Sequence, residues 1–271
     1  GFIDIHTHSD MSLLLDGRGQ SKVSQGVTTE VTGNCGFSPF PINPRHMQLH
    51  ADLLAGIVDD AMEISWTDLE GYRNVAQRQG IAVNVAPLVG HGALRIAAMG
   101  VEARPARAQE MAQMQQLLER QLDQGAFGLS TGLTYVPSRY APIEELVSLC
   151  ETLARRKRLY ASHARDKDLL GDDPRYGPLN ELLHLGRSTG ARVQFSHAAI
   201  NSPSLWGSAG AWTERFDAAV AEGVDAGFDV YPYDASSSAL TQYLPAWVQE
   251  GGVAAMRERL SDEATMARAE T

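Results

Sequence analysis

The chain has 271 residues, of which 44% are hydrophobic, and a formal net charge of −10. This length and apolar content support a sizeable core, in one large α/β barrel or in two ordinary domains. The acidic balance argues against nucleic acid and anionic membrane surfaces as partners. No apolar stretch approaches the roughly 18 residues of a membrane-spanning helix.

The chain has two cysteines, too few for a disulfide framework, and no signal peptide is visible. We therefore expect a reducing, cytoplasmic location. Because the sequence begins at Gly1 inside a strand-like run, we expect residues 1–271 to be one barrel domain cut from a longer protein.

Short β-rich runs alternate with helix-like segments along the chain. The runs are mostly apolar and β-branched or aromatic, as expected of strands buried on both faces. They are Phe2–His8, Thr28–Asn34, Ala82–Val89, Phe127–Gly132, Leu159–His163, Arg192–His197 and Gly227–Tyr233.

The predicted helices have clear start and stop signals. Thr67 and Glu70 form a candidate capping box. Pro105 opens and Gly125 closes the segment Ala106–Gln124, as helix ends prefer. Methionine and leucine recur there at helical spacing, which indicates core packing. Further helices are predicted at Pro142–Arg158, Leu179–Ser188 and Trp212–Glu222, and Leu244–Thr271 is predicted to be helix and then tail.

Seven strands alternating with helices fit either a doubly wound sheet or a (β/α)₈ barrel. Reactive side chains stand at or just past the ends of different strands, and a barrel gathers those ends into one ring. We therefore predict an incomplete (β/α)₈ barrel of about seven strands. The residues at these ends are His6, His8, Cys35, His163, His197 and Tyr231.

These strand-end residues are of the types that hold a divalent metal. His6 and His8 are two apart, so on an extended strand both rings would project to one face. Cys35 lies in Gly33-Asn34-Cys35-Gly36, where the glycines allow close approach of backbone and ligand. One thiolate and two imidazoles with a water form a catalytic zinc shell with an open position. Each residue alone could be an ordinary buried or polar side chain.

Several blocks together resemble one family. Phe2–Asp10 is similar to the first-strand motif of the metal-dependent amidohydrolases, and Gly33–Gly36 to the cysteine motif of their D-aminoacylase branch, the N-acyl-D-amino-acid deacylases. Further similar blocks are Val89–Arg95, Gly125–Pro137 and Asp229–Tyr233. The resemblance runs in order from Gly1 to about Leu244.

The resemblance implies a zinc-dependent hydrolase that cleaves the amide bond of a small N-acyl-D-amino acid with metal-activated water. Cys35, His163 and His197 would hold a tightly bound Zn²⁺, and His6 and His8 would line a second, weaker position.

Three residues are candidates for contact with substrate. By the resemblance, Tyr135 would meet the substrate carboxylate and Tyr231 would polarise the scissile carbonyl. His91, between Gly90 and Gly92 after the third strand, is a further candidate for the substrate pocket.

Two departures from the family pattern matter. The family's catalytic aspartate ends the eighth strand, which these 271 residues do not include. The flanking β-sandwich is also absent. We therefore expect little activity from this segment by itself.

Other readings remain open. The fourth strand carries no lysine, which disfavours the hydantoinase and dihydroorotase pattern. A deaminase or dipeptidase of the same superfamily, a non-catalytic metal-binding barrel and a purely structural barrel are the alternatives. The sequence leaves open the preferred side chain and acyl group, the number and identity of metals, and the oligomeric state.

Overall fold

One curved parallel sheet forms the framework of the protein. The computed structural model describes residues 1–55, 57, 63–165, 176–200, 203 and 206–269. Within them seven strands lie in the order β1-β2-β3-β4-β5-β6-β7, and every neighbouring pair is parallel. The strands are β1 (Phe2–Asp4), β2 (Val27–Thr32), β3 (Asn84–Gly90), β4 (Gly128–Gly132), β5 (Leu159–His163), β6 (Arg192–Phe195) and β7 (Ala226–Phe228).

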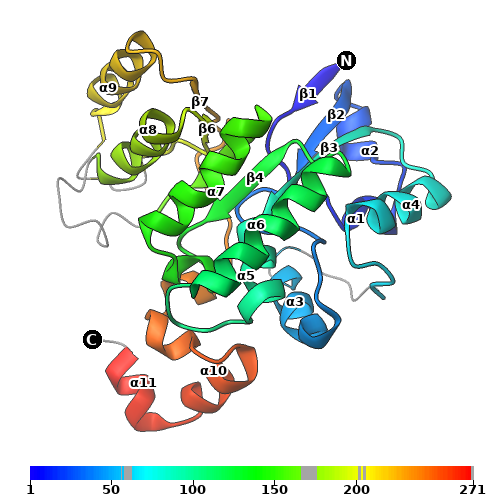
Figure 1. Ribbon diagram of the computed structural model, residues 1–271, viewed down its shortest axis with the longest axis vertical. Coiled ribbons are helices and arrows are strands. Elements are labelled where there is room, and N and C mark those ends of the chain that lie inside the picture. Colours follow the sequence, from blue (N-terminus) through cyan, green and yellow to red (C-terminus); the bar gives the residue numbers. More distant parts are fainter. Residues whose placement is uncertain (56, 58–62, 166–175, 201–202, 204–205, 270–271) are drawn as a thin grey trace.

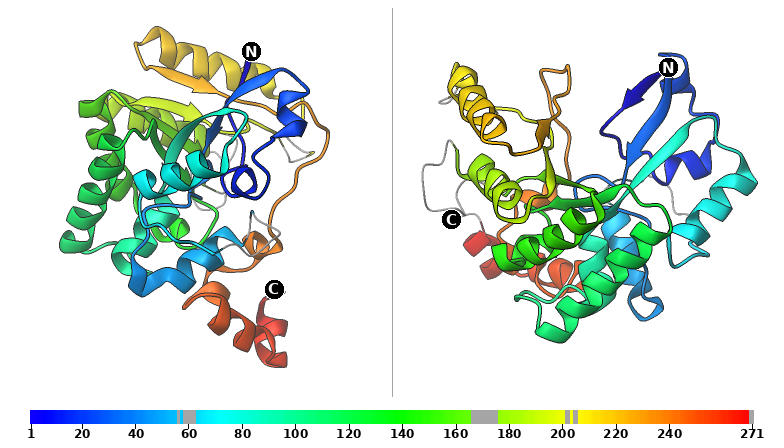
Figure 2. Two further views of the ribbon diagram at one scale, coloured as in Figure 1. Left: turned by 90° about the vertical axis from the view of Figure 1, so that its right-hand side faces the viewer. Right: turned by 45° about the horizontal axis from the view of Figure 1, so that its top comes forward.

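Helices lie between successive strands, as the barrel prediction requires. They are α1 (Ser12–Leu15), α2 (Gln20–Val23), α3 (Met47–Leu54), α4 (Leu69–Gln79), α5 (His91–Met99), α6 (Ala108–Asp123), α7 (Ile143–Arg156), α8 (Gly177–Thr189) and α9 (Ala209–Ala221), with α10 (Val253–Leu260) and α11 (Glu263–Ala269) after the last strand. The sheet curls with β1 and β7 at its two ends (Figures 1 and 2). The predicted incomplete (β/α)₈ barrel is confirmed.

The hydrophobic core lies between the middle strands and the helices α6 to α8. Met114 and Leu118 of α6 are completely buried, as their helical spacing predicts. Leu149 and Cys150 of α7 are equally buried, so Cys150 is a core residue. Figure 1 shows α5, α6 and α7 side by side over β3 and β4.

Some predicted boundaries are wrong. The cap of α4 is Asp68, whose Oδ1 accepts a hydrogen bond from Gly71 N at 3.0 Å, and not a Thr67 capping box. The strand β1 ends at Asp4, and Asp4 Oδ1 accepts from His6 N at 3.1 Å. β7 likewise ends at Phe228, before Tyr231.

The helix α5 has no counterpart in the sequence prediction. All of its residues except Ala98 are buried. With nine residues, α5 is shorter than the window of 11–18 residues over which a helical period becomes clear. None of the helices within the described residues is long and apolar enough to cross a membrane.

Candidate metal centre

The two histidines of the first motif follow β1 and do not continue it. Thr7 N donates to Val31 O at 3.3 Å, which keeps the segment against β2. The rings of His6 and His8 are half-buried, with centroids 5.5 Å apart. Strand alternation is therefore not what brings them together, although both side chains still reach the same site.

Cys35 sits in a tight turn after β2. Its φ is +54°, and the flanking Gly33 and Gly36 have φ of +75° and +79°. A Cβ on Gly33 would lie 2.1 Å from Leu88 O, so a side chain cannot fit there. Gly36 N donates to Ser130 Oγ at 2.9 Å, which fixes the turn against β4. The glycines thus serve the close approach that the sequence indicated.

His163 is the last residue of β5 and is held by the segment that follows β4. Thr134 Oγ1 lies 2.8 Å from His163 Nε2. Leu133 N donates to His163 O at 3.0 Å. The ring of Tyr135 lies 4.8 Å from that of His163, centroid to centroid.

His197 follows β6 in a left-handed backbone conformation, with φ of +40°. This conformation is uncommon for a residue other than glycine. Its backbone N donates to Asp229 Oδ1 at 2.6 Å, which holds the residue in place. The His197 ring lies 4.5 Å from His163 and 5.2 Å from His6, centroid to centroid.

The thiol of Cys35 is the common point of the cluster. Its Sγ lies 3.3 Å from His6 Nε2 and 3.5 Å from His197 Nε2. Ligand atoms within 4.8 Å of one another form two groups that share Cys35, the first with His6 and His8, the second with His163 and His197. All five predicted metal ligands therefore converge.

The donor set fits zinc. Sulfur and nitrogen ligands at about 2.0–2.3 Å from a tetrahedral zinc ion lie roughly 3.5 Å apart, close to the separations around Cys35. Nδ1 of His8 is buried and has no hydrogen-bond partner. A buried polar atom without a partner is costly, and coordination of a cation would satisfy it.

Burial also sets the protonation of these ligands. It lowers the pKa of His8 and of His197 to about 4, and that of His163 well below its usual value, with repulsion between the rings adding to the effect. The imidazoles are therefore neutral near pH 7, the form that binds metals. Burial raises the pKa of the Cys35 thiol, and the carboxylates of Asp229 and Asp10 raise it further. A bound cation reverses that preference and favours the thiolate.

Asp229 is a site residue that the sequence reasoning missed. Its Oδ1 lies 3.2 Å from His6 Nδ1 and accepts from His197 N, while Oδ2 accepts from Gln194 Nε2 at 3.1 Å. One carboxylate thus orients one metal ligand through its ring and another through its backbone. Asp229 lies just past β7, as the other site residues lie at or past the ends of their strands, and this position could have identified it in the sequence.

The remaining predicted site residues lie in three different settings. Tyr135 is half-buried between His163 and Phe37, whose ring lies 5.0 Å away. Tyr231 is half-buried on the segment after β7. His91 is fully buried, and its two ring nitrogens contact Ser138 Oγ at 2.9 Å and Glu145 Oε1 at 2.8 Å. In this arrangement neither nitrogen of His91 is available to a substrate.

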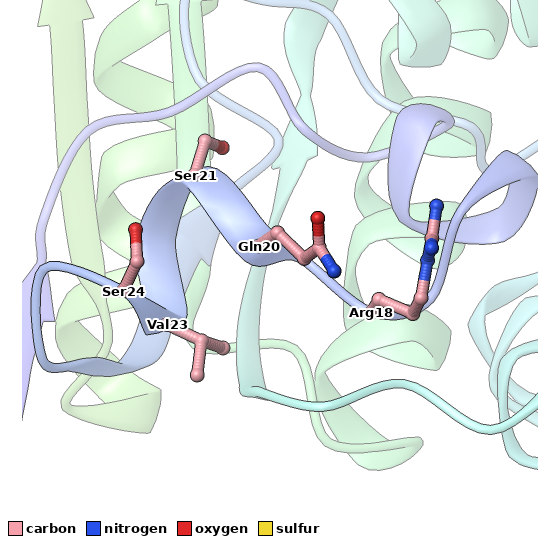
Figure 3. Close-up of a pocket in the computed structure, with 5 residues that line it drawn as sticks. All are labelled: Arg18, Gln20, Ser21, Val23 and Ser24. Carbon is pink, nitrogen blue, oxygen red and sulfur yellow. The ribbon is translucent and has the colours of Figure 1, made fainter.

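Two hollows lie near the first strand. One of about 440 Å³ is lined by His8, Ser9 and Glu30 among others, and so reaches the candidate metal centre. The other, of about 520 Å³, lies beside α2 and is lined by Arg18, Gln20, Ser21, Val23 and Ser24 (Figure 3). It contains no candidate metal ligand, whereas His8 lines the smaller hollow.

Comparison with known proteins agrees with this geometry. The model of the amidohydrolase family matches residues 1–271. The chain is 37% identical to an N-acyl-D-glutamate deacylase of Alcaligenes xylosoxydans xylosoxydans over 244 residues, which are 89% of this chain and 47% of that protein. It is 36% identical to a D-aminoacylase of the same organism over 242 residues, covering 89% and 48%.

A solved structure resembles the fold as well. The N-acyl-D-glutamate deacylase from Bordetella bronchiseptica, complexed with zinc and a phosphonate inhibitor, matches with a TM-score of 0.77 and 36% identity, over 88% of this chain and 48% of that one. The chain spans about half the length of the curated relatives it matches. From its family match and its metal-ligand geometry, the chain belongs to the amidohydrolase family, and its resemblance to the D-aminoacylase branch is confirmed.

Proposed function

We propose that the protein containing this chain hydrolyses the amide bond of N-acyl-D-amino acids in a metal-dependent reaction. The observation that carries the proposal is the convergence on Cys35 of four histidines from three separate regions of the chain. Relatives at 36–37% identity are a D-aminoacylase and an N-acyl-D-glutamate deacylase, which supports the substrate class.

In this proposal Cys35, His163 and His197 hold one Zn²⁺ tightly. His6 and His8 line a second, weaker position that shares Cys35. Zinc supplies a Lewis acid that lowers the pKa of a bound water to about 7 and polarises the amide carbonyl. The chain's own contribution is to bury the ligands and to turn them towards one another, and Asp229 orients His6 and His197.

The two tyrosines have different proposed roles. Tyr231 donates a hydrogen bond to the carbonyl oxygen, where one such donor is worth roughly 3–4 kcal/mol in the transition state. Tyr135 binds the substrate carboxylate beside His163. The general base would be the aspartate that the family places on an eighth strand. A cytoplasmic location is part of the proposal, since both cysteines are free.

The test measures zinc content and turnover of N-acetyl-D- and N-acetyl-L-amino acids by the complete protein. We expect bound zinc, turnover of the D-series and retention of both in a Cys150→Ser control, because Cys150 lies in the core. Zinc without turnover would instead support a non-catalytic metal-binding barrel. Turnover of the L-series alone, or of dipeptides or aminated heterocycles instead, would exclude the proposed substrate.

A further inference from the structure

A chain of four buried polar side chains links the start of α5 to the segment that follows β4. His91 Nδ1 lies 2.9 Å from Ser138 Oγ, and His91 Nε2 lies 2.8 Å from Glu145 Oε1. Arg95 Nη1 donates to both oxygens of Glu145 at 2.7 Å. All four residues are at most 4% exposed. We call Ser138, His91, Glu145 and Arg95 the α5 network.

The charge states of His91 and Glu145 decide which group donates and which accepts in each hydrogen bond. Burial lowers the pKa of His91, so the ring is neutral near pH 7. A carboxylate can only accept, so Nε2 carries the proton that His91 donates to Glu145. Nδ1 must then accept, and Ser138 Oγ donates to it. The charges of Arg95 and Glu145 balance each other, so every member of the network has a defined role.

The order serine, histidine, carboxylate also occurs in hydrolases with a serine nucleophile. Here Ser138 is only 2% exposed, and Arg95 packs behind the carboxylate. A nucleophile has to reach its substrate, so burial excludes that chemistry. Any effect of the network on the site must therefore pass through the backbone segments that carry its members.

Ser138 is attached to the part of the chain that touches the metal centre. Arg139 N donates to Tyr135 O at 2.8 Å, and Tyr135 N donates to Gly132 O at 3.0 Å. The same segment carries Thr134, whose hydroxyl contacts His163 Nε2. The Tyr135 ring lies between the rings of His163 and Phe37. A shift of Ser138 would therefore move the ring of Tyr135, which lies beside the metal centre.

A second anchor holds the far end of this segment. Arg165, only 9% exposed in its side chain, donates to Arg139 O at 3.3 Å and to Ala141 O at 3.0 Å, and it pairs with Glu181. Arg165 fixes the backbone after Ser138, whereas the α5 network fixes the side chain of Ser138 itself. The network connects this segment to α5, whose first turn packs against the Cys35 turn through Gly92 N and Gly36 O at 3.0 Å.

We propose that Ser138, His91, Glu145 and Arg95 are positioning residues that fix Tyr135 beside the metal centre and thereby set the affinity for the substrate. This inference rests on the proposed function, because it assigns the binding of the substrate carboxylate to Tyr135. His91 acts on the substrate through Ser138 and Tyr135, and not by direct contact.

The test uses Ser138→Ala, which removes one hydroxyl without adding volume. Tyr140→Phe is the matched control, because its hydroxyl lies in the same turn but donates to Ala246 O at 3.0 Å, outside the network. In the complete zinc-loaded protein we expect Ser138→Ala to raise KM about tenfold and to change kcat less than about twofold, as expected for loss of one hydrogen bond that positions a binding group. Zinc content should stay unchanged, and Tyr140→Phe should leave all three values unchanged.

A second readout does not depend on turnover. With 3-fluorotyrosine placed at position 135, the ¹⁹F resonance should be displaced from that of free fluorotyrosine by the rings of His163 and Phe37. Ser138→Ala should move it towards the free position, and Tyr140→Phe should not. An unchanged resonance and KM in Ser138→Ala would overturn the proposal, as would loss of zinc or a fall in kcat without a change in KM. If the wild type hydrolyses no N-acyl-D-amino acid, the proposed function fails, and the fluorine shift still decides whether the network positions Tyr135.

Discussion

The middle and the two ends of the sheet differ in burial although they are built from the same repeating unit. Leu88 in β3 and Leu129 in β4 are completely buried, whereas Phe2 and Ile3 in β1 are 71% and 61% exposed. Phe228 in β7 is also exposed. A middle strand has neighbours on both sides, and a strand at the end has one. The composition of a strand therefore indicates only that the strand can be buried. Its neighbours in the sheet decide whether its side chains are covered.

The candidate metal centre joins these two regions. His6 and His8 follow β1, and Asp229 follows β7, so both ends of the sheet contribute. Cys35 follows β2, His163 is the last residue of β5, and His197 follows β6. A metal ion held by this set would connect an exposed end of the sheet to its middle. Metal binding therefore tests how the end strands and the middle strands differ in stability.

The largest expected effect is on metal binding. Cys35→Ser removes the one donor that both ligand groups share, so we expect zinc affinity to fall by more than roughly a hundredfold. Zinc should slow amide hydrogen exchange in β1 and β7 of the wild type more than in β4, and should have no such effect in the variant. Retention of full zinc content by Cys35→Ser, measured by atomic absorption, would contradict the assignment of the ligands.

The buried carboxylate of Glu145 should make the stability of the folded protein depend on pH. Burial by itself would raise the pKa of Glu145, but hydrogen bonds from His91 and Arg95 lower it to about 2. Because this pKa is lower than in the unfolded chain, the unfolded state takes up more protons as the pH falls, and Glu145's contribution is lost from about pH 4.5 towards pH 2. Glu145→Gln leaves Arg95 buried without a counter-charge, at a cost of about 3 kcal/mol at neutral pH.

Urea unfolding between pH 7 and pH 2 measures this effect. The gap in unfolding free energy between wild type and Glu145→Gln should narrow steadily as the pH falls. The exposed pair Arg192–Asp225 next to the open end serves as the control, because both its side chains are more than 60% exposed and screening limits it to less than about 1 kcal/mol. A gap that stays constant with pH would show that Glu145 is not charged in the folded protein.

Core substitutions compare the two regions directly. Leu129→Ala in β4 should lower the free energy of unfolding by about 2–5 kcal/mol, because it leaves a cavity in a fully packed core. In residues 1–271 by themselves, Ile3→Ala in β1 should cost less than about 1 kcal/mol, because most of the Ile3 side chain is already in water. Equal losses for the two variants in urea unfolding would mean that β1 is covered in solution.

The carboxylate that orients the ligands should have a smaller effect on zinc binding than Cys35 has. Asp229→Asn weakens the contact with His6 and the acceptor for His197 N, so we expect zinc affinity to fall by about 10–100-fold. Asp225→Asn is a matched control four residues earlier, since Asp225 is exposed and pairs with Arg192. Zinc titration by calorimetry distinguishes the two, and equal affinities for both variants would remove Asp229 from the site.

Much of the framework could be predicted because it rests on local chemistry. The strand positions follow from short apolar runs, and α6 and α7 from helical spacing with clear end signals. The predicted ends of β1, β2, β6 and β7 were wrong because strand composition does not mark the residue at which the chain leaves the sheet. The helices α3 and α5 were missed because each is shorter than the window over which a helical period becomes clear.

The sequence by itself determined the ligand types and the strand ends at which they occur, because a thiol or an imidazole keeps its chemistry wherever the chain takes it. Only the tertiary structure decided that one sulfur is shared by two ligand groups, that Asp229 orients His6 and His197, and that His91 faces Glu145 instead of a pocket. Each of these is a contact between segments far apart in sequence. Such contacts depend on how the strands align and how the sheet curves, which no local pattern records.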